Sequence, residues 1–281
     1  MQLKCGKHSL DITTPVVMGI LNATPDSFSD GGSYYSSGRL VTDLVLRRAE
    51  AMLEQGAAIL DVGGESTRPG AAPVGEQEEL DRVLPVVEAL VQKFDALVSV
   101  DTSRSSVIRE SAALGAGLIN DVRALSCDGA LEAAASVGLP VCLMHMQGQP
   151  DTMQKAPSYA DIEREVEAFL QWRIRECLAA GIQKNNLLID PGFGFGKSLT
   201  HNLTLLAKLP KLLEMGYPVL VGLSRKSLLG HLLNRDVNER LVGSVCLAQI
   251  AAQKGAAILR VHDVAETVDM LKILNAVREC E

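Results

Sequence analysis

Eight short apolar runs, separated by longer amphipathic segments, constrain the fold of this chain more than any other feature. The runs are rich in β-branched residues, apolar without alternation and bounded by Gly or Pro, which is typical of strands buried on both faces. They are PVVMGIL from Pro15, AAILDV from Ala57, ALVSV from Ala96, GLIN from Gly117, PVCLM from Pro140, NLLI from Asn186, PVLVGL from Pro218 and AAILRV from Ala256. Eight strand-then-helix units predict an α/β fold, a (β/α)₈ TIM barrel, in a single domain spanning residues 1–281.

A doubly wound parallel sheet is the alternative fold. It would need a dinucleotide fingerprint or a break in the pattern at a switch point, and the sequence has neither. Six glycines follow the expected helix ends, where a left-handed cap is favoured. They are Gly56, Gly115, Gly138, Gly181, Gly216 and Gly255.

A weak internal repeat supports the barrel. GAAILDV, GAGLIND and GAAILRV align without gaps, which places Asp61, Asn120 and Arg260 at the same step of strands two, four and eight. Because alternate strands of a barrel fill common layers, these three side chains are expected to share one inward-facing layer. The glycines alone would equally suit ordinary helix-to-strand junctions.

Composition excludes several functional classes. The 281 residues are 47% hydrophobic and 22% charged, with a formal net charge of −7; a nucleic-acid binder would instead show a basic face. No apolar run reaches membrane-spanning length, and the first 15 residues lack a signal-peptide core. The six cysteines form no CxxC pair, and we interpret them as small buried residues of a reducing compartment. These features predict a cytoplasmic protein, and an anionic substrate would require a local basic cluster.

A polar residue follows each of the eight runs. Active sites of barrels are built at the C-terminal ends of the strands, whereas a single Asp or Asn there often only caps a helix or holds a turn. The residues, in chain order, are Asn22, Asp61, Asp101, Asn120, His145, Asp190, Ser224 with Lys226, and Arg260 with His262. The complete set favours a catalytic face.

Three connections on this face have unusual composition. Residues 22–38 and 63–75 are long and rich in Gly, Pro and Ser, which is typical of functional or disordered loops, and we expect both to be mobile lids. PGFGFGKS (residues 191–198) is not a phosphate loop, because Pro191 occupies the position of the first Walker A glycine. We interpret it as a tight glycine loop over a flat ligand, with Phe195 stacked on that ligand; a plain turn is the alternative.

The segments after strands seven and eight carry the basic residues. SRKS (224–227) and RVHD (260–263) lie where barrels often bind phosphate. Arg260 and His262 should face the same way along an extended segment, and Asp263 should cap the next helix. A buried Arg requires a partner: either a bound anion, which we favour, or Asp61 in the same layer.

These residues resemble a known family. GILNATPDSFSDGG (residues 19–32) and GAAILDVGGESTRPG (residues 56–70) closely resemble the two signature stretches of dihydropteroate synthases. Six further stretches match in the family's order: SVDTS, INDVR, LMHMQG, LIDPGFGFGK, GLSRKS and RVHDV. The resemblance covers essentially the whole chain. Its one noticeable departure is Ala23, where a valine is common, a small apolar change.

The resemblance implies a transferase of folate biosynthesis and a target of sulfonamides. The amine of p-aminobenzoate would displace diphosphate from a 7,8-dihydropterin CH₂ group by a dissociative route, giving 7,8-dihydropteroate, with Mg²⁺ bound at Asn22. The implied pterin site is Asp101, Asn120, Met144, Asp190, Phe195, Gly222 and Lys226. The implied diphosphate site is Asn22, Asp61, Thr67, Arg260 and His262. The implied p-aminobenzoate site is Ser27, Phe28, Arg68, Pro69 and Ser227. The residues expected to be catalytic are Asp101, Lys226, Arg260 and Asp30.

The residue types suit this chemistry. Asp and Asn complement the donors and acceptors of a pterin edge, Arg, His⁺ and Mg²⁺ stabilise a departing diphosphate, and closed lids exclude water from a pterin cation. Homodimers are common in this family. The apolar faces of residues 244–253 and 268–277 would suit such an interface, or packing on the barrel.

Three other functions are considered. A pterin-binding methyltransferase would use the same barrel, but SFSD and SRKS argue against it. A Schiff-base aldolase would use Lys226 as its nucleophile; such a lysine should lie within a strand and have a depressed pKa, whereas Lys226 lies past the apolar run beside Arg225. A barrel that binds an anion or a pterin without turnover is the non-enzymatic alternative.

Overall fold

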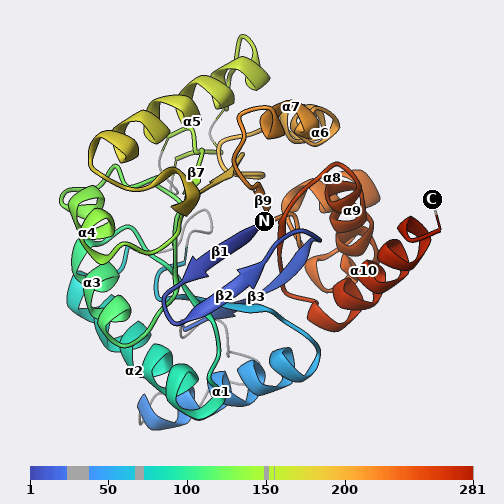
Figure 1. The fold of residues 1–281 in the computed structure, drawn as a ribbon. Helices are drawn as coiled ribbons and strands as arrows, with labels where there is room; N and C mark the ends of the chain where they lie inside the picture. Colours follow the sequence, from blue (N-terminus) through green and yellow to red (C-terminus); the bar gives the residue numbers. More distant parts are fainter. Residues whose placement is uncertain (24–37, 67–72, 149–151, 155, 281) are drawn as a thin grey trace.

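The computed structural model describes residues 1–23, 38–66, 73–148, 152–154 and 156–280. In this part of the chain, eight parallel strands form the predicted barrel and helices surround it (Figure 1). The strands are β3 (Val16–Asn22), β4 (Ile59–Gly63), β5 (Val98–Asp101), β6 (Leu118–Asp121), β7 (Val141–Met144), β8 (Leu187–Asp190), β9 (Leu220–Val221) and β10 (Ile258–Val261). All eight predicted strands are confirmed.

The sheet runs in the order β8-β7-β6-β5-β4-β3-β10-β9. A parallel bridge between Ile189 and Val219 joins its two edge strands and closes the barrel. Closure removes the unpaired edges that an open sheet would expose. The doubly wound alternative is therefore excluded.

Helices cover the outside of the barrel. They are α1 (Gly38–Glu54), α2 (Glu76–Phe94), α3 (Ser105–Ala113), α4 (Ala130–Val137), α5 (Ile162–Ala179), α6 (Leu199–Ala207), α7 (Leu209–Leu213), α8 (Ser227–Leu233), α9 (Leu241–Gln253) and α10 (Val264–Arg278), with 3₁₀ turns η2 (Lys184–Asn186) and η3 (Val237–Glu239). All six predicted cap glycines have positive φ values, which confirms their role. None of the described helices is long and apolar enough to cross a membrane.

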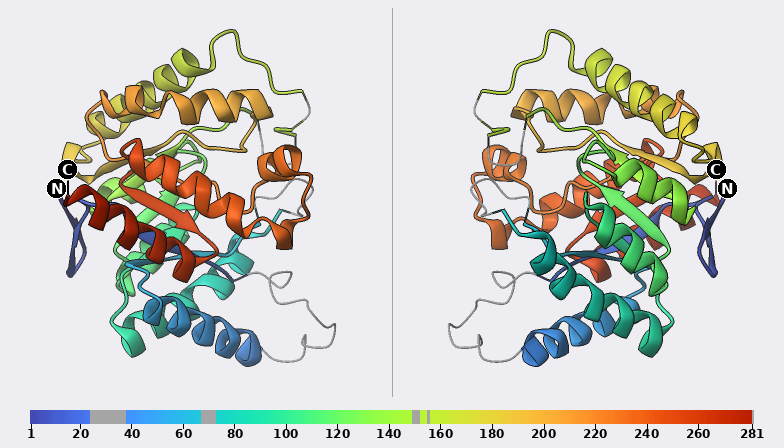
Figure 2. Two further views of the ribbon diagram at one scale, coloured as in Figure 1. Left: turned by 90° about the vertical axis from the view of Figure 1, so that its right-hand side faces the viewer. Right: turned by 90° about the vertical axis from the view of Figure 1, so that its left-hand side faces the viewer.

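An N-terminal hairpin, which the sequence pattern did not predict, pairs β1 (Gln2–Cys5) with β2 (His8–Asp11). It lies across the end of the barrel where the strands begin (Figures 1 and 2). Leu3, Cys5 and Ile12 pack there on the first residues of the barrel strands, including Met18 and Ile59. A second, larger core fills the space between strands and helices. The hairpin closes one end of the barrel, so the polar strand ends lie at the other.

The cysteines are more varied than predicted. All six are unpaired, and Cys5, Cys142 and Cys177 are buried as expected. Cys127 is half-buried, however, and Cys246 and Cys280 are exposed. The last two lie on α9 and just after α10, on faces turned away from the barrel.

Candidate active site

The strand register brings the predicted polar residues to one rim. Asn22 pairs in register with Gly63, which pairs with Asp101, which in turn pairs with Asn120. Farther round the barrel, Met144 pairs with Asp190. Because all eight strands run in the same direction, their C-terminal residues form a ring at the end opposite the hairpin.

Arg260 joins three strands at the centre of this ring. Its Nε donates to Asp61 Oδ2 at 2.6 Å, and its Nη2 donates to Asp101 Oδ2 at 2.9 Å. Asn120 Nδ2 donates to the same Asp61 oxygen at 3.2 Å. The layer predicted from the internal repeat is therefore confirmed. Arg260 has both carboxylates as protein partners, and its side chain remains 20% exposed, so binding of an anion would add to an existing ion pair.

This cluster shifts the pKa of its members. Burial raises the pKa of Asp101 to about 7; Arg260 opposes the shift and Asp61 adds to it. Burial alone would lower the pKa of Arg260, but Asp61 and Asp101 raise it above its ordinary value. Asp61 Oδ1 is buried and accepts no hydrogen bond from the described residues. The cluster thus contains a fixed cation, a carboxylate whose pKa is raised to about 7 and a fully buried carboxylate oxygen without a hydrogen bond from the described residues.

Lys226 and Asp190 form the opposite side of the ring. The Lys226 ammonium donates to the carbonyl of Phe193 and lies 4.5 Å from the centre of the Phe195 ring. Burial lowers the pKa of Lys226 to about 8, and Asp190 opposes this shift. Burial raises the pKa of Asp190, against the influence of Lys226 and the backbone N–H of Gly192. The lowered pKa of Lys226 meets one of the two requirements for an aldolase nucleophile. Its position does not meet the other, because Lys226 lies past the end of the strand and not within it.

The glycine loop between β8 and α6 approaches its neighbours very closely. Gly192, Gly194 and Gly196 all have positive φ values. A Cβ atom on Gly192 would lie only 1.8 Å from the carbonyl oxygen of His145 and 3.3 Å from Met144 Cγ. Only glycine fits this contact. The loop therefore packs against the end of β7, and Phe195 has Lys226 as a partner on its ring.

The segment after β10 differs from the prediction in two ways. Asp263 is the residue before α10, but its carboxylate makes no cap hydrogen bond; it instead forms an ion pair with Arg225, with 3.0 Å between Asp263 Oδ2 and Arg225 Nε. His262 was expected to supply positive charge, yet burial and the nearby cations Arg260 and Arg225 lower its pKa to about 3. Its imidazole is therefore neutral, and its Nδ1 lies 3.1 Å from Ser224 Oγ.

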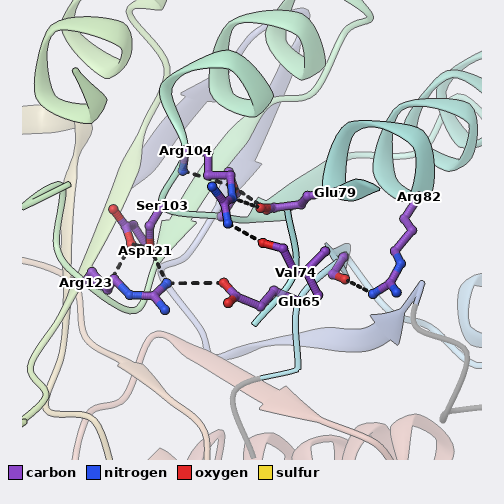
Figure 3. Close-up of polar contacts among 10 residues, drawn as sticks. Glu65, Val74, Glu79, Arg82, Ser103, Arg104, Asp121 and Arg123 are labelled. Carbon is purple, nitrogen blue, oxygen red and sulfur yellow. Dashed lines mark hydrogen bonds and ion pairs between the residues drawn. The ribbon is translucent and has the colours of Figure 1, made fainter. Parts of the chain in front are cut away.

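A second polar network supports the ends of β5 and β6 (Figure 3). Arg104 Nε donates to buried Glu79 at 2.8 Å, and Thr102 donates to the same carboxylate at 2.6 Å. Arg104 also donates to the carbonyl of Val74. Thr102 directly follows Asp101, so Glu79 holds the backbone that carries this carboxylate.

The same network extends to the residues that follow β4. Arg82 Nη1 donates to the carbonyl of Gly64 at 2.8 Å, and Arg123 Nη1 lies 3.4 Å from Glu65 Oε2. Arg123 also reaches Ser103, which donates to Asp121. Arg82 on α2, Arg104 just before α3 and Arg123 just after β6 therefore fix the backbone and side chains on either side of the connection from β4 to α2 (Figure 3).

The remaining predicted residues divide into two groups. Among those described, Asn22 is half-buried at the end of β3, Gly222 lies beside the Arg260 side chain, and Ser227 is exposed at the start of α8. The others lie outside the described residues: Ser27, Phe28, Asp30, Thr67, Arg68 and Pro69. The same holds for most of the two predicted lids, residues 22–38 and 63–75.

Lys197 was not predicted as a functional residue, although it lies within the PGFGFGKS segment. The Lys197 side chain is only 3% exposed, and its Nζ lies 2.9 Å from His145 Nδ1. The sequence signal that could have indicated its burial is its position at the end of a segment of Gly and Phe residues, where a solvent-exposed surface is not expected. Glu79 was also missed, because it looks like an ordinary acidic residue in the first turn of a helix.

Comparisons with known proteins agree with this site. Residues 18–262 match the family model described as pterin binding enzyme. The dihydropteroate synthase of Escherichia coli strain K12 is 57% identical over 276 residues, covering 98% of this chain and 96% of the relative. The Yersinia pestis dihydropteroate synthase, solved with a sulfonamide drug complex, is 58% identical with a TM-score of 0.94, covering 99% of this chain and 100% of that one.

A third relative was solved with the expected product. Dihydropteroate synthase from Xanthomonas albilineans, in complex with 7,8-dihydropteroate, is 47% identical with a TM-score of 0.89, and 99% of each chain is covered. The aligned regions cover 98–99% of this chain. The chain therefore belongs to the dihydropteroate synthase family of pterin-binding enzymes.

Proposed function

We propose that this chain catalyses the reaction of its family, the condensation of (7,8-dihydropterin-6-yl)methyl diphosphate with p-aminobenzoate to give 7,8-dihydropteroate and diphosphate. The observation that carries the proposal is Arg260 at the centre of the barrel mouth, bonded to Asp61 and Asp101 and facing the Lys226–Asp190 side. This arrangement offers acceptors to a pterin edge and a permanent cation to a leaving group.

The pterin would lie between the two sides of the ring. The carboxylates of Asp101 and Asp190 accept hydrogen bonds from the amino and ring N–H groups of a pterin, and Asn120 can both donate and accept. Lys226 donates to a ring acceptor, while Phe195, Met144 and Gly222 contact the flat faces. Ionised Asp101 would also stabilise positive charge that develops on the pterin CH₂ group.

The diphosphate would lie toward Arg260 and His262. Asp61 is completely buried and already paired with Arg260, so we assign it the orientation of Arg260 rather than contact with the anion. His262 is neutral among its protein neighbours, and a bound dianion would raise its pKa, so the imidazole would gain a proton with the substrate. Thr67 completes the group predicted from the family.

A magnesium ion belongs to the proposal. Among the residues that the structure describes, there is no cluster of three or more His, Cys, Asp or Glu residues able to hold a metal. Mg²⁺ usually retains several waters and binds through one or two protein oxygens together with substrate phosphates. The half-buried Asn22 carboxamide at the end of β3 fits this mode. When bound, the ion would neutralise charge on the leaving diphosphate.

The proposed reaction forms no covalent intermediate with the protein. The carbon–oxygen bond of the pterin CH₂ group breaks, and its electron pair leaves with diphosphate. The lone pair of the p-aminobenzoate nitrogen then forms the carbon–nitrogen bond, and that nitrogen loses a proton, which the released diphosphate accepts. We assign p-aminobenzoate to Ser27, Phe28, Arg68, Pro69 and Ser227, and assign Asp30 a role in stabilising the pterin cation.

We further propose that the protein is a cytoplasmic homodimer. Its six unpaired cysteines suit a reducing compartment. Exposed apolar side chains gather on α8, η3, α9 and α10, which lie together on one side of the barrel (Figure 1). They are Leu232, Leu233, Val237, Val242, Ile250, Ile273 and Val277. A two-fold axis over this face would bury them, and light scattering of wild type and Val242→Glu tests the assignment.

A turnover assay tests the proposed reaction. Purified protein with pterin diphosphate, p-aminobenzoate and Mg²⁺ should release diphosphate and form dihydropteroate, identified by mass. A sulfonamide should compete with p-aminobenzoate, because the two share an aryl amine. Parallel incubation with methyltetrahydrofolate and a thiol acceptor tests the methyltransferase alternative. Methyl transfer without dihydropteroate formation would overturn the proposal, and pterin binding without any turnover would favour the non-enzymatic alternative.

A further inference from the structure

Lys197 is a buried amine whose position requires an explanation. Only 3% of its side chain is exposed, and lysine is almost never fully buried unless it is paired. No ion pair of Lys197 forms within the described part of the chain, although the charge of Asp190 acts to raise the pKa of its amine. Burial lowers its pKa to about 7. Burying an amine costs free energy, so the contacts of its ammonium must compensate for that cost.

The ammonium donates to two different loops. Its Nζ lies 2.9 Å from the carbonyl oxygen of Gly192, 3.0 Å from that of Phe195 and 2.9 Å from His145 Nδ1. The carbonyl oxygen of His145 lies farther away, at 3.4 Å. An ammonium has three donors, so the three shorter contacts can use all of them. His145 directly follows β7, whereas Gly192 and Phe195 belong to the glycine loop after β8. Lys197 therefore ties the ends of two neighbouring strands together.

The glycine loop in turn holds residues of the proposed pterin site. Within it, the Phe193 carbonyl accepts from Lys226, and the backbone N–H of Gly192 donates to Asp190 Oδ1 at 2.7 Å. The Phe195 ring lies under the Lys226 ammonium. A displacement of this loop would move three groups of the proposed pterin site: Lys226, Asp190 and Phe195.

Other contacts also hold this loop, including one from the Gln154 side-chain amide to the carbonyl of Gly194. Asn202 Oδ1 accepts from the backbone N–H of Gly194 at 2.7 Å, and Tyr159 Oη donates to the carbonyl of Gly196 at 2.8 Å. Among the described residues, Lys197 alone binds the carbonyls of both Gly192 and Phe195, the two ends of the tight turn. That turn itself contains a backbone hydrogen bond from Phe195 to Gly192 at 3.1 Å.

We infer that Lys197 is a positioning residue for the pterin substrate. Its ammonium fixes the turn from Gly192 to Lys197 so that Lys226, Phe195 and Asp190 are arranged for the pterin before it binds. Lys197 does not touch the substrate and acts through the loop. The inference rests on the proposed function for its kinetic consequences, but its consequence for pterin binding can be measured without turnover.

The principal test compares Lys197→Met with a matched control, Lys254→Met. Methionine retains the length and apolar volume of the side chain and removes all three donors. Lys254 also donates to a backbone carbonyl, that of Ala207 at 3.0 Å, but lies on the outer surface just after α9. Melting temperature, binding of 6-hydroxymethyl-7,8-dihydropterin by calorimetry, and steady-state kinetics are measured well below the melting temperature. Lys197→Met should weaken pterin binding and lower kcat/KM for the pterin diphosphate by tenfold or more, while the KM for p-aminobenzoate changes less. Lys254→Met should match the wild type.

A second pair of variants tests the positioning role of Lys197 if Lys197→Met does not fold. His145→Leu removes one acceptor of the ammonium, whereas His145→Asn retains an acceptor near the position of Nδ1. Pterin binding should weaken severalfold in His145→Leu and recover in His145→Asn. A folded Lys197→Met protein with wild-type pterin affinity would overturn the inference, as would equal affinities in the two His145 variants. If the wild type binds the pterin without forming dihydropteroate, the proposed function fails while the affinity comparison still tests Lys197.

Discussion

Replacement of Arg260 by alanine should affect both stability and chemistry. The substitution removes the partner of Asp61, which is completely buried, and of Asp101, which is 14% exposed. Breaking a buried pair in this way costs about 3–5 kcal/mol. Because the pKa of Asp101 is about 7, its carboxylate can take up a proton when the cation is lost. The loss of stability should therefore lie at the lower end of this range, at about 3 kcal/mol. For a chain of this length, that corresponds to a decrease of about 5 °C in melting temperature.

The chemical effect has a different origin. Negative charge on the diphosphate increases as its bond to carbon breaks, so a fixed cation stabilises the transition state more than the bound substrate. Loss of one such contact typically costs about 3 kcal/mol, or roughly a hundredfold in rate. The single-turnover rate should therefore fall about a hundredfold, and diphosphate should raise the melting temperature of the variant less than that of the wild type.

The assay combines thermal unfolding, with and without diphosphate, and single-turnover kinetics. Arg109→Ala is the matched control, since Arg109 is an exposed arginine on α3 that donates to Ser136 Oγ at 2.9 Å, far from the barrel mouth. An Arg260→Ala protein that melts several degrees lower, yet reacts at the normal rate and is normally stabilised by diphosphate, would refute a role for Arg260 in anion binding. A variant with an unchanged melting temperature would refute the energetic argument for the ion pair.

Three further predictions concern neighbouring residues. The kcat/KM for the pterin substrate should rise as the pH increases through about 7, where Asp101 loses its proton, and should fall through about 8, where Lys226 loses its proton. The Asp101→Asn variant should lack the rise at acidic pH. A wild-type profile that is flat from pH 6 to 9 would contradict the assignment. Lys226→Ala should lower turnover, because the variant loses contacts to the substrates and not a covalent imine. Borohydride treatment of the wild type in the presence of substrate should therefore leave the intact mass of the protein unchanged. An adduct at Lys226 would instead support the aldolase alternative. Arg104→Met should leave the buried Glu79 carboxylate without its cation and lower stability by about 2 kcal/mol, measured by urea unfolding; stability equal to that of the wild type would show that the network contributes nothing.

The internal repeat shows how a sequence can predict a site without any contact being known. The spacing of Asp61, Asn120 and Arg260 within three similar runs was sufficient to place them in one layer, because side-chain direction in a strand follows from position alone. The spacing gave no information about the partner of Arg260. The sequence favours an anion as that partner, whereas the structure has Asp61 and Asp101 bonded to Arg260. Pairing depends on how closely β4, β5 and β10 approach one another across the barrel, and the sequence does not give these distances.

What the sequence determined by itself was therefore the set of strands, their common direction and the chemistry at their ends. Periodicity, cap glycines and long specific motifs are local properties, and they sufficed for the barrel and the family. Only the tertiary structure decided the environment of each ionisable group: the neutral state of His262, the ion pair of Asp263 with Arg225, and the burial of Lys197 beside His145. A side chain's pKa and partners depend on the elements packed around it, and for Lys197 and His145 those partners lie 52 residues apart in the chain.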